Sequence, residues 1–201
     1  MITTIILDIG QVLANFRWKE YLVECGYDQE TIEKIGNATV LSKLWAEEDR
    51  GKLRTEELVK LCCEKEPSVA KEITKLFADI TLLVREYEYS ASFVQSLKNN
   101  GYKVYLLSNY GESNFKYARE NFNFIPYVDG GVISYEVKYI KPEPEIYKAL
   151  MNKYNINPKE AVFLDDCEAN LEGARKFGIA TILVEEFDKA LDELRDLGVR
   201  I

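Results

Sequence analysis

The chain contains no histidine among its 201 residues. This absence excludes Ser-His-Asp and Cys-His catalysis, His-ligated zinc and phosphohistidine intermediates. Any acid, base or nucleophile must therefore come from Asp, Glu, Lys, Ser, Tyr or Cys. Carboxylates that act together with a hard cation become the leading possibility, because hard cations bind oxygen ligands.

Cysteine is also scarce, and the four cysteines form no CxxC pair, which gives no support to a zinc ribbon or a thioredoxin-like motif. No apolar run approaches the roughly 20 residues that a membrane span needs. The short apolar stretch 5–7 is interrupted at once by Asp8, unlike a secretory signal. We therefore expect a cytoplasmic protein with reduced thiols.

Positive charge is outnumbered, and the formal net charge is −8. Broad binding to nucleic acid is unfavourable, because it requires a basic face that neutralises phosphates. An anionic substrate also meets a repelling global field. A phosphate site in this chain would need strong local positive charge, such as a lysine and a metal ion.

Strand and helix patterns alternate in most of the chain. Apolar runs at 3–7, 103–107, 161–164 and 181–184 predict strands, and 90–99, 112–121, 144–154 and 168–177 predict helices. Residues 15–84 show only helical periodicity, as in 30–35, 55–64 and 69–77. The pattern predicts an α/β fold, a doubly wound parallel sheet formed by 1–14 and 85–201, with an all-helical insertion at 15–84.

Three of the predicted strands end in polar residues, namely Asp8, Ser108-Asn109 and Asp165-Asp166. Each alone could be a turn former or a helix cap, and Lys141 alone could be an ordinary surface lysine. In a parallel sheet, however, all of these strand ends lie at one edge, where ligands bind. The joint pattern therefore predicts a functional site at this edge.

With these motifs in place, the sequence resembles the haloacid dehalogenase superfamily of hydrolases over nearly its whole length. The insertion resembles the small helical cap of the family's first cap class. The resemblance is carried, in order and spacing, by Ile5–Leu13, Val104–Asn109, Lys141–Tyr147, Val162–Asp166 and Asn170 with Gly173–Ile179.

The resemblance implies a Mg²⁺-dependent phosphatase of small phosphorylated metabolites, with Asp8 as the nucleophile that forms an aspartyl-phosphate. Mg²⁺ would be held by Asp8, by the backbone carbonyl of Gly10, directly by Asp166 and through water by Asp165.

Other residues would serve the phosphate. Lys141 would pair with Asp8 and with the phosphate, while the Ser108 hydroxyl and the Asn109 backbone amide would bind phosphate oxygens. Asn170 would anchor the metal or Lys141 from behind. Tyr110 is the best aromatic candidate to face the substrate.

One departure from the family is specific. Most phosphatases of this family carry a second Asp two residues after the nucleophile, as general acid and base, and here that position is Gly10. The pattern resembles an α-glucose-1-phosphatase-like subgroup, which shares the stretch Asp49–Leu53 and implies a sugar phosphate, such as a sugar 1-phosphate. The leaving group of a sugar 1-phosphate is the acidic anomeric hydroxyl, which needs less help from a general acid to depart. We hypothesise that Gln11 or a cap carboxylate (Glu47, Glu48 or Asp49) orients the water.

Three alternatives stay open. A metal-independent 2-haloacid dehalogenase would also use an Asp nucleophile, but Asp165-Asp166 argues for a cation site. A phosphomutase would need the Asp that is missing at position 10. A phospho-ligand binding module that lacks the general acid at Gly10 would explain the departure without catalysis. We expect a monomer or a homodimer.

Overall fold

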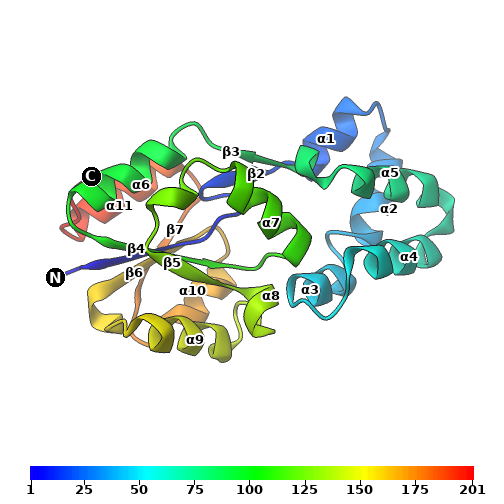
Figure 1. The fold of residues 1–201 in the computed structure, drawn as a ribbon. Coiled ribbons are helices and arrows are strands. Elements are labelled where there is room, and N and C mark those ends of the chain that lie inside the picture. Colours follow the sequence, from blue (N-terminus) through cyan, green and yellow to red (C-terminus); the bar gives the residue numbers. More distant parts are fainter.

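The chain folds around a five-stranded parallel sheet in the order β5-β4-β1-β6-β7. The computed structural model describes residues 1–201, except for the side chain of residue 80. The strands are β1 (Thr4–Leu7), β4 (Lys103–Ser108), β5 (Gly130–Ile133), β6 (Ala161–Asp165) and β7 (Ala180–Leu183). The predicted α/β class with a doubly wound parallel sheet is confirmed, and the carboxyl ends of the strands face the helical insertion (Figure 1).

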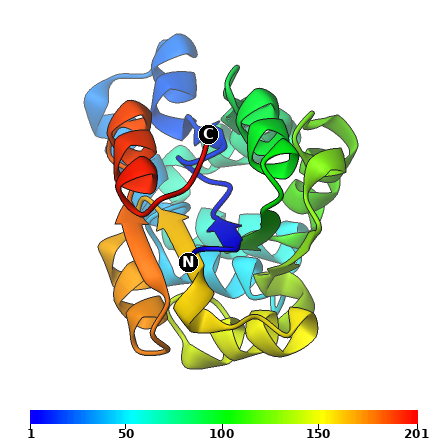
Figure 2. The same cartoon turned by 90° about the vertical axis from the view of Figure 1, so that its left-hand side faces the viewer.

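Both faces of the sheet are buried, which is why its strands read as continuous apolar runs. Ile5 and Leu7 point into one hydrophobic cluster with Phe93 and Leu194, whereas Ile6 points into the other cluster with Tyr147. Helices cover each face (Figure 2). They are α6 (Ser90–Asn99), α7 (Glu112–Asn121), α8 (Ser134–Val137), α9 (Pro144–Tyr154), α10 (Glu168–Arg175) and α11 (Phe187–Asp196).

The predicted helices at 90–99, 112–121 and 144–154 coincide with α6, α7 and α9. Four 3₁₀ turns complete the helical content: η1 (Pro67–Val69), η2 (Ile80–Leu83), η3 (Ile125–Tyr127) and η4 (Pro158–Glu160). The charged C-terminal segment forms α11, which buries Ala190 and Leu194 in the hydrophobic core.

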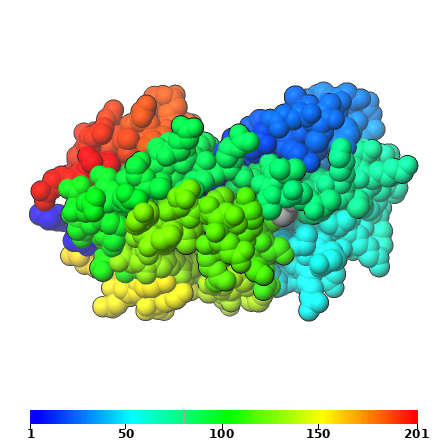
Figure 3. Space-filling view, turned by 45° about the horizontal axis from the view of Figure 1, so that its top comes forward, coloured from blue at the N-terminus to red at the C-terminus, as the bar shows by residue number. Residues whose placement is uncertain are grey.

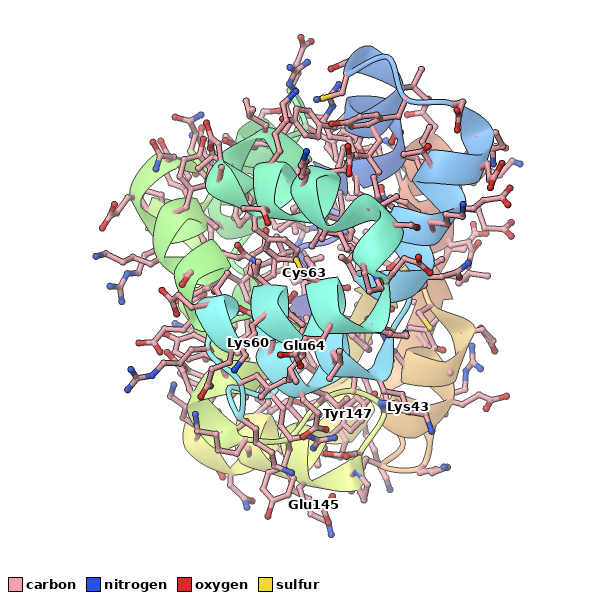
Figure 4. The ribbon with its side chains drawn as sticks, turned by 90° about the vertical axis from the view of Figure 1, so that its right-hand side faces the viewer. Lys43, Lys60, Cys63, Glu64, Glu145 and Tyr147 are labelled. Atoms are coloured by element: carbon pink, nitrogen blue, oxygen red, sulfur yellow. The ribbon has the colours of Figure 1, made fainter. Side chains whose placement is uncertain are left out.

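The insertion between β1 and β4 is helical and has its own hydrophobic cluster, built by residues such as Trp18, Ile35, Leu58 and Ile73. It contains α1 (Trp18–Glu24), α2 (Gln29–Ala38), α3 (Lys43–Asp49), α4 (Thr55–Lys65) and α5 (Ala70–Ala78). We call it the cap. Seen from outside, its α4 presents the labelled Lys60 and Glu64 to solvent (Figure 4), with charged atoms 3.9 Å apart.

Two short strands join the cap to the sheet domain, and the sequence pattern did not predict them. β2 (Ala14–Phe16) and β3 (Val84–Glu86) pair antiparallel, with Asn15 opposite Arg85. Each has three residues, too few to show an alternating pattern. The surface is hollowed beside this ribbon, where cap and core meet (Figure 3). The exact division at residues 14–15 and 84–85 stays a prediction.

The edge strand β5 was also missed, and its glycines explain why. A Cβ on Gly131 would lie 2.7 Å from the backbone oxygen of Leu106, so the close approach to β4 requires glycine. Glycine has a low strand propensity, which hid the strand from its sequence. In the part of the chain that the structure describes, every helix is too short or too polar to span a membrane.

Candidate active site

The polar residues at the strand ends lie together at the sheet edge that faces the cap. Leu7 pairs with Leu106 and with Leu164, so the residues that follow in β1 and β6, and the end of β4, share this edge. The Asp8 backbone amide donates to Leu164 O over 3.0 Å. Immediately after Asp8 the chain turns, and the Ala14 amide donates to Ile9 O over 2.8 Å.

Lys141 is the cation of the site. Its Nζ lies 2.9 Å from Asp8 Oδ1 and 2.6 Å from Asp165 Oδ2, and the side chain is 1% exposed. Burial alone would lower the pKa of Lys141, but Asp8 and Asp165 raise it above its ordinary value. The lysine therefore stays charged between two carboxylates.

Burial has the opposite effect on the nucleophile candidate. Desolvation raises the pKa of Asp8 to about 7, against the lowering effects of Lys141 and of the Ser108 hydroxyl. Ser108 is buried, and its hydroxyl is near enough to Asp8 to lower the pKa of that carboxyl. A further positive charge at this edge would favour the ionised carboxylate that nucleophilic attack requires.

Two asparagines hold Lys141 and Asp165 in place. The Asn109 side chain accepts from the Lys141 backbone amide over 2.7 Å and donates to Lys141 O over 3.1 Å. Asn170 Nδ2 donates to Asp165 Oδ1 over 2.9 Å, and the Cys167 amide donates to the same oxygen over 2.8 Å. Asn109 thus fixes the lysine loop through its side chain, a contact that the sequence did not reveal.

The acidic side chains form a set that fits Mg²⁺. Asp8, Asp165 and Asp166 each offer one carboxylate oxygen, and these oxygens all lie within 4.8 Å of one another. Both oxygens of Asp165 already accept bonds from protein groups, whereas Asp166 is exposed. An all-carboxylate set with an exposed member suits a hard cation that keeps part of its water shell.

A small pocket of about 90 Å³ opens between this sheet edge and the cap. Its polar lining includes Gly10, Asn109, Asn114 and the cap residue Asp49. The rest of its wall is apolar or aromatic: Phe16, Trp45, Val84 and Tyr110. Tyr110 lines this pocket, and its contact with substrate stays a prediction, whereas no sequence motif indicated Phe16.

The candidates for orienting water occupy different places. Gln11 Nε2 donates to Phe16 O over 3.2 Å, and Gln11 Oε1 accepts from Tyr87 Oη over 3.0 Å, so both ends of this amide serve the β2 connection. Glu47 pairs with Arg50 over 3.2 Å at the surface. Glu48 packs against Gly111 and does not line the pocket.

Polar contacts hold the cap segment that follows α3 against the core. Arg50 forms a bidentate ion pair with Glu143, with N–O distances of 2.5 and 2.7 Å. Ser134 Oγ donates to Asp49 O over 2.6 Å. Because these partners lie 85 to 93 residues apart, no local motif could have indicated them.

Comparison with known proteins agrees with this geometry. Residues 2–178 match the haloacid dehalogenase-like hydrolases, and the chain belongs to this family. It is 42% identical over 77 residues to bifunctional epoxide hydrolase 2 of Sus scrofa, a match that covers 38% of this chain and 14% of that protein. The chain spans less than a fifth of the length of the mammalian epoxide hydrolases that it matches.

Two other similarities extend over nearly whole chains. D-ribitol-5-phosphate phosphatase of Bacteroides thetaiotaomicron is 26% identical, with 92% of this chain and 93% of that protein covered. A crystal structure of a HAD-family enzyme from the same organism, in complex with magnesium and inorganic phosphate, is 27% identical. It superposes with a TM-score of 0.73 and covers 94% of this chain and 98% of that chain.

Proposed function

We propose that the chain is a Mg²⁺-dependent phosphatase that hydrolyses small phosphomonoesters through an aspartyl-phosphate on Asp8. The observation that carries the proposal is the buried ammonium of Lys141, held 2.9 Å from Asp8, next to the acidic set of Asp8, Asp165 and Asp166. A carboxylate nucleophile, a fixed cation and a cation-binding set are the groups that phosphoryl transfer to a carboxylate needs.

In this proposal Asp8 attacks phosphorus, and the bond to the leaving oxygen breaks. Lys141 stays beside Asp8 and neutralises charge on the phosphoryl oxygens, assisted by the Ser108 hydroxyl and the Asn109 amide. Water then attacks phosphorus and releases Asp8. Mg²⁺, held by Asp8, Gly10 O and Asp166, with Asp165 reaching it through water, would offset the repulsion between the carboxylate and the phosphate dianion.

For the substrate we propose a sugar phosphate, with a sugar 1-phosphate as the leading candidate, as the likeness to α-glucose-1-phosphatase-like enzymes implies. A sugar presents flat C–H faces as well as hydroxyls, which suits a pocket with aromatic walls at Trp45 and Tyr110 and a free amide oxygen on Asn114. A cytoplasmic location and a monomer or homodimer are also proposed.

The first experiment measures phosphate release from an aryl phosphate with Mg²⁺. We expect turnover in the unaltered protein and in the exposed-site control Glu56→Gln, and its loss in Asp8→Asn and in excess EDTA. Turnover that survives Asp8→Asn would remove Asp8 from the nucleophile role. Halide release from 2-chloropropionate in EDTA would favour a dehalogenase instead, and phosphate binding without turnover would favour a binding module.

The second experiment compares glucose 1-phosphate with glucose 6-phosphate. The anomeric hydroxyl is the better leaving group, so we expect the higher kcat/KM for the 1-phosphate. A higher kcat/KM for the 6-phosphate would contradict the sugar 1-phosphate as the preferred substrate.

A further inference from the structure

The sheet domain offers the leaving oxygen no free acid. Within the described residues, Lys141 is committed to Asp8 and Asp165, and the acidic set is the cation site of the proposed function, on which this inference rests. Gly10 carries no side chain, and a Cβ placed there would meet no atom within 4 Å. Space is therefore open at the position next to the nucleophile, and a proton donor must reach it from elsewhere.

The cap supplies one carboxylate to this space. Three acidic residues follow one another at the end of α3, and their side chains diverge. Glu47 binds Arg50 and Lys52 at the surface. Glu48 packs on Gly111. Asp49 lines the pocket together with Gly10, Asn109 and Tyr110, and its charge is close enough to interact with those of Asp8 and Lys141.

The segment that carries Asp49 is fixed to the core on both sides. Ser134 Oγ donates to the Asp49 carbonyl over 2.6 Å. The next residue, Arg50, is clamped by Glu143, and Lys138 Nζ donates to Gly51 O over 2.9 Å. A group held by this many contacts to the sheet domain is pre-positioned for chemistry when the cap is closed.

We propose that Asp49 is the general acid and base of the reaction, carried by the cap. In the first step Asp8 Oδ forms a bond to phosphorus, the bond between phosphorus and the ester oxygen breaks, and the Asp49 carboxyl gives its proton to that oxygen. In the second step water attacks phosphorus, and Asp49 takes its proton. The bond between phosphorus and Asp8 breaks, which releases inorganic phosphate and restores both carboxyl groups.

The electrostatic surroundings suit this role. Burial raises the pKa of Asp49 well above its usual value, and the charges of Glu48 and Asp8 add to this effect. The Gly111 backbone amide and Lys141 oppose it without cancelling it, so the carboxyl can hold a proton before the leaving group departs. The other ionisable group in the pocket is unsuited. Burial raises the pKa of Tyr110 above its usual value, and Asp8 and Asp49 add to the effect, so the phenol is a weak acid at neutral pH.

The test compares Asp49→Asn, an isosteric change, with the unaltered protein and with Glu56→Gln, an exposed carboxylate on the same cap. With glucose 6-phosphate, whose alkoxide leaves poorly, we expect kcat to fall about 10²- to 10⁴-fold in Asp49→Asn only. With p-nitrophenyl phosphate, whose phenolate leaves unaided, we expect a burst of nitrophenol equal to the enzyme concentration, followed by slow turnover because the water lacks a base.

Two outcomes would overturn the proposal. One is a kcat in Asp49→Asn within about threefold of the unaltered protein on glucose 6-phosphate. The other is an equal loss with both leaving groups and no burst, which a merely structural role would give. If Asp49→Asn fails to fold, the unaltered protein decides. Across a series of aryl phosphates, kcat/KM should fall only weakly as the pKa of the leaving group rises, and a steep fall would contradict the proposal. A modest preference for glucose 1-phosphate over glucose 6-phosphate is compatible with this weak dependence. Failure of the proposed function is distinct, since the unaltered protein would then release no phosphate.

Discussion

Lys141 shows how a single residue can hold the whole site together. It is the one cation that the site geometry places between Asp8 and Asp165, at 2.9 and 2.6 Å, and it is almost fully buried. A buried ion pair contributes little net stability while intact, because desolvation opposes the Coulomb attraction. Removal of one partner is costly, because the remaining charges are then buried without compensation.

The change Lys141→Met should therefore affect both stability and activity. We expect the free energy of unfolding in urea at pH 7 to fall by about 3 kcal/mol and phosphate release to be lost. Lys148→Met, an exposed lysine of α9, is the matched control and should change neither. A Lys141→Met variant with the stability of the control and half of the original activity would contradict the role given to this lysine.

At the level of single residues, the sequence predicted which polar side chains lie at the ends of the strands. Asp8, Ser108 and Asp165 follow apolar runs, and parallel topology alone brings such positions to one edge. The sequence did not predict the choice among Glu47, Glu48 and Asp49. Consecutive residues of a helix end point in different directions, and only the packing of the cap against the core decides which one enters the pocket.

At the scale of elements, periodicity predicted long helices better than short strands. The amphipathic spacing of α6, α7 and α9 was sufficient to define their bounds. β5 was hidden by Gly130 and Gly131, whose role is close approach to a neighbour and not strand propensity. β2 and β3 are paired by long-range contact between the two ends of the cap, which no local pattern encodes.

The contact between α3 and the start of α7 should make stability depend on pH. Glu48 is 3% exposed, packs on Gly111, receives one long bond from the Thr55 hydroxyl, and leaves Oε2 without a partner among the described residues. Burial raises the pKa of Glu48 to about 7. Since the folded state favours the protonated acid, its stability is fully present below the ordinary pKa of 4.5 and declines as pH rises through 7.

The change Glu48→Gln removes this decline. Between pH 4 and pH 8 we expect the urea-unfolding free energy of Glu48→Gln to gain on that of the unaltered protein by up to about 3 kcal/mol. Because Glu48 also raises the pKa of Asp49, the difference between the two proteins reports Glu48 together with its coupling to Asp49. Glu56→Gln serves as the exposed control. Parallel pH profiles for Glu48→Gln and the unaltered protein would show that Glu48 does not ionise within this contact.

For the whole molecule, the arrangement of cap and core explains how a small pocket can admit a substrate. The paired strands β2 and β3 connect the cap to the core, and the pocket lies between the cap and the core. A hinge movement at β2 and β3 would therefore expose the pocket. On the other side Arg50 and Glu143 form a polar contact that holds the closed form. Polar contacts of this kind can be broken and re-formed in each catalytic cycle, which an apolar interface would resist.

Weakening this contact should open the cap. The change Glu143→Gln removes a partly buried ion pair. We expect it to destabilise the closed form relative to the open form by about 1 kcal/mol, which is roughly a fivefold rise in the open population. The two tryptophans separate this from unfolding, because Trp18 is buried in the cap and Trp45 lines the pocket. In Glu143→Gln, acrylamide should quench the fluorescence of Trp45 more strongly than in the unaltered protein. Added salt should increase this quenching in the unaltered protein, because salt weakens the ion pair. Glu145→Gln is the control and should behave like the unaltered protein. Equal quenching in the unaltered protein, Glu143→Gln and Glu145→Gln would show that the contact between Arg50 and Glu143 does not hold the cap closed.

The central claim concerns the bond that Asp8 forms. The most direct measurement is an acid quench during turnover with an aryl phosphate and Mg²⁺, followed by mass spectrometry of the peptide that contains Asp8. We predict that this peptide gains the mass of one phosphoryl group on Asp8, and that the modified fraction is larger in Asp49→Asn, where hydrolysis is slowed. Steady release of phosphate with an unmodified Asp8, or with the phosphoryl group on another residue, would contradict the account.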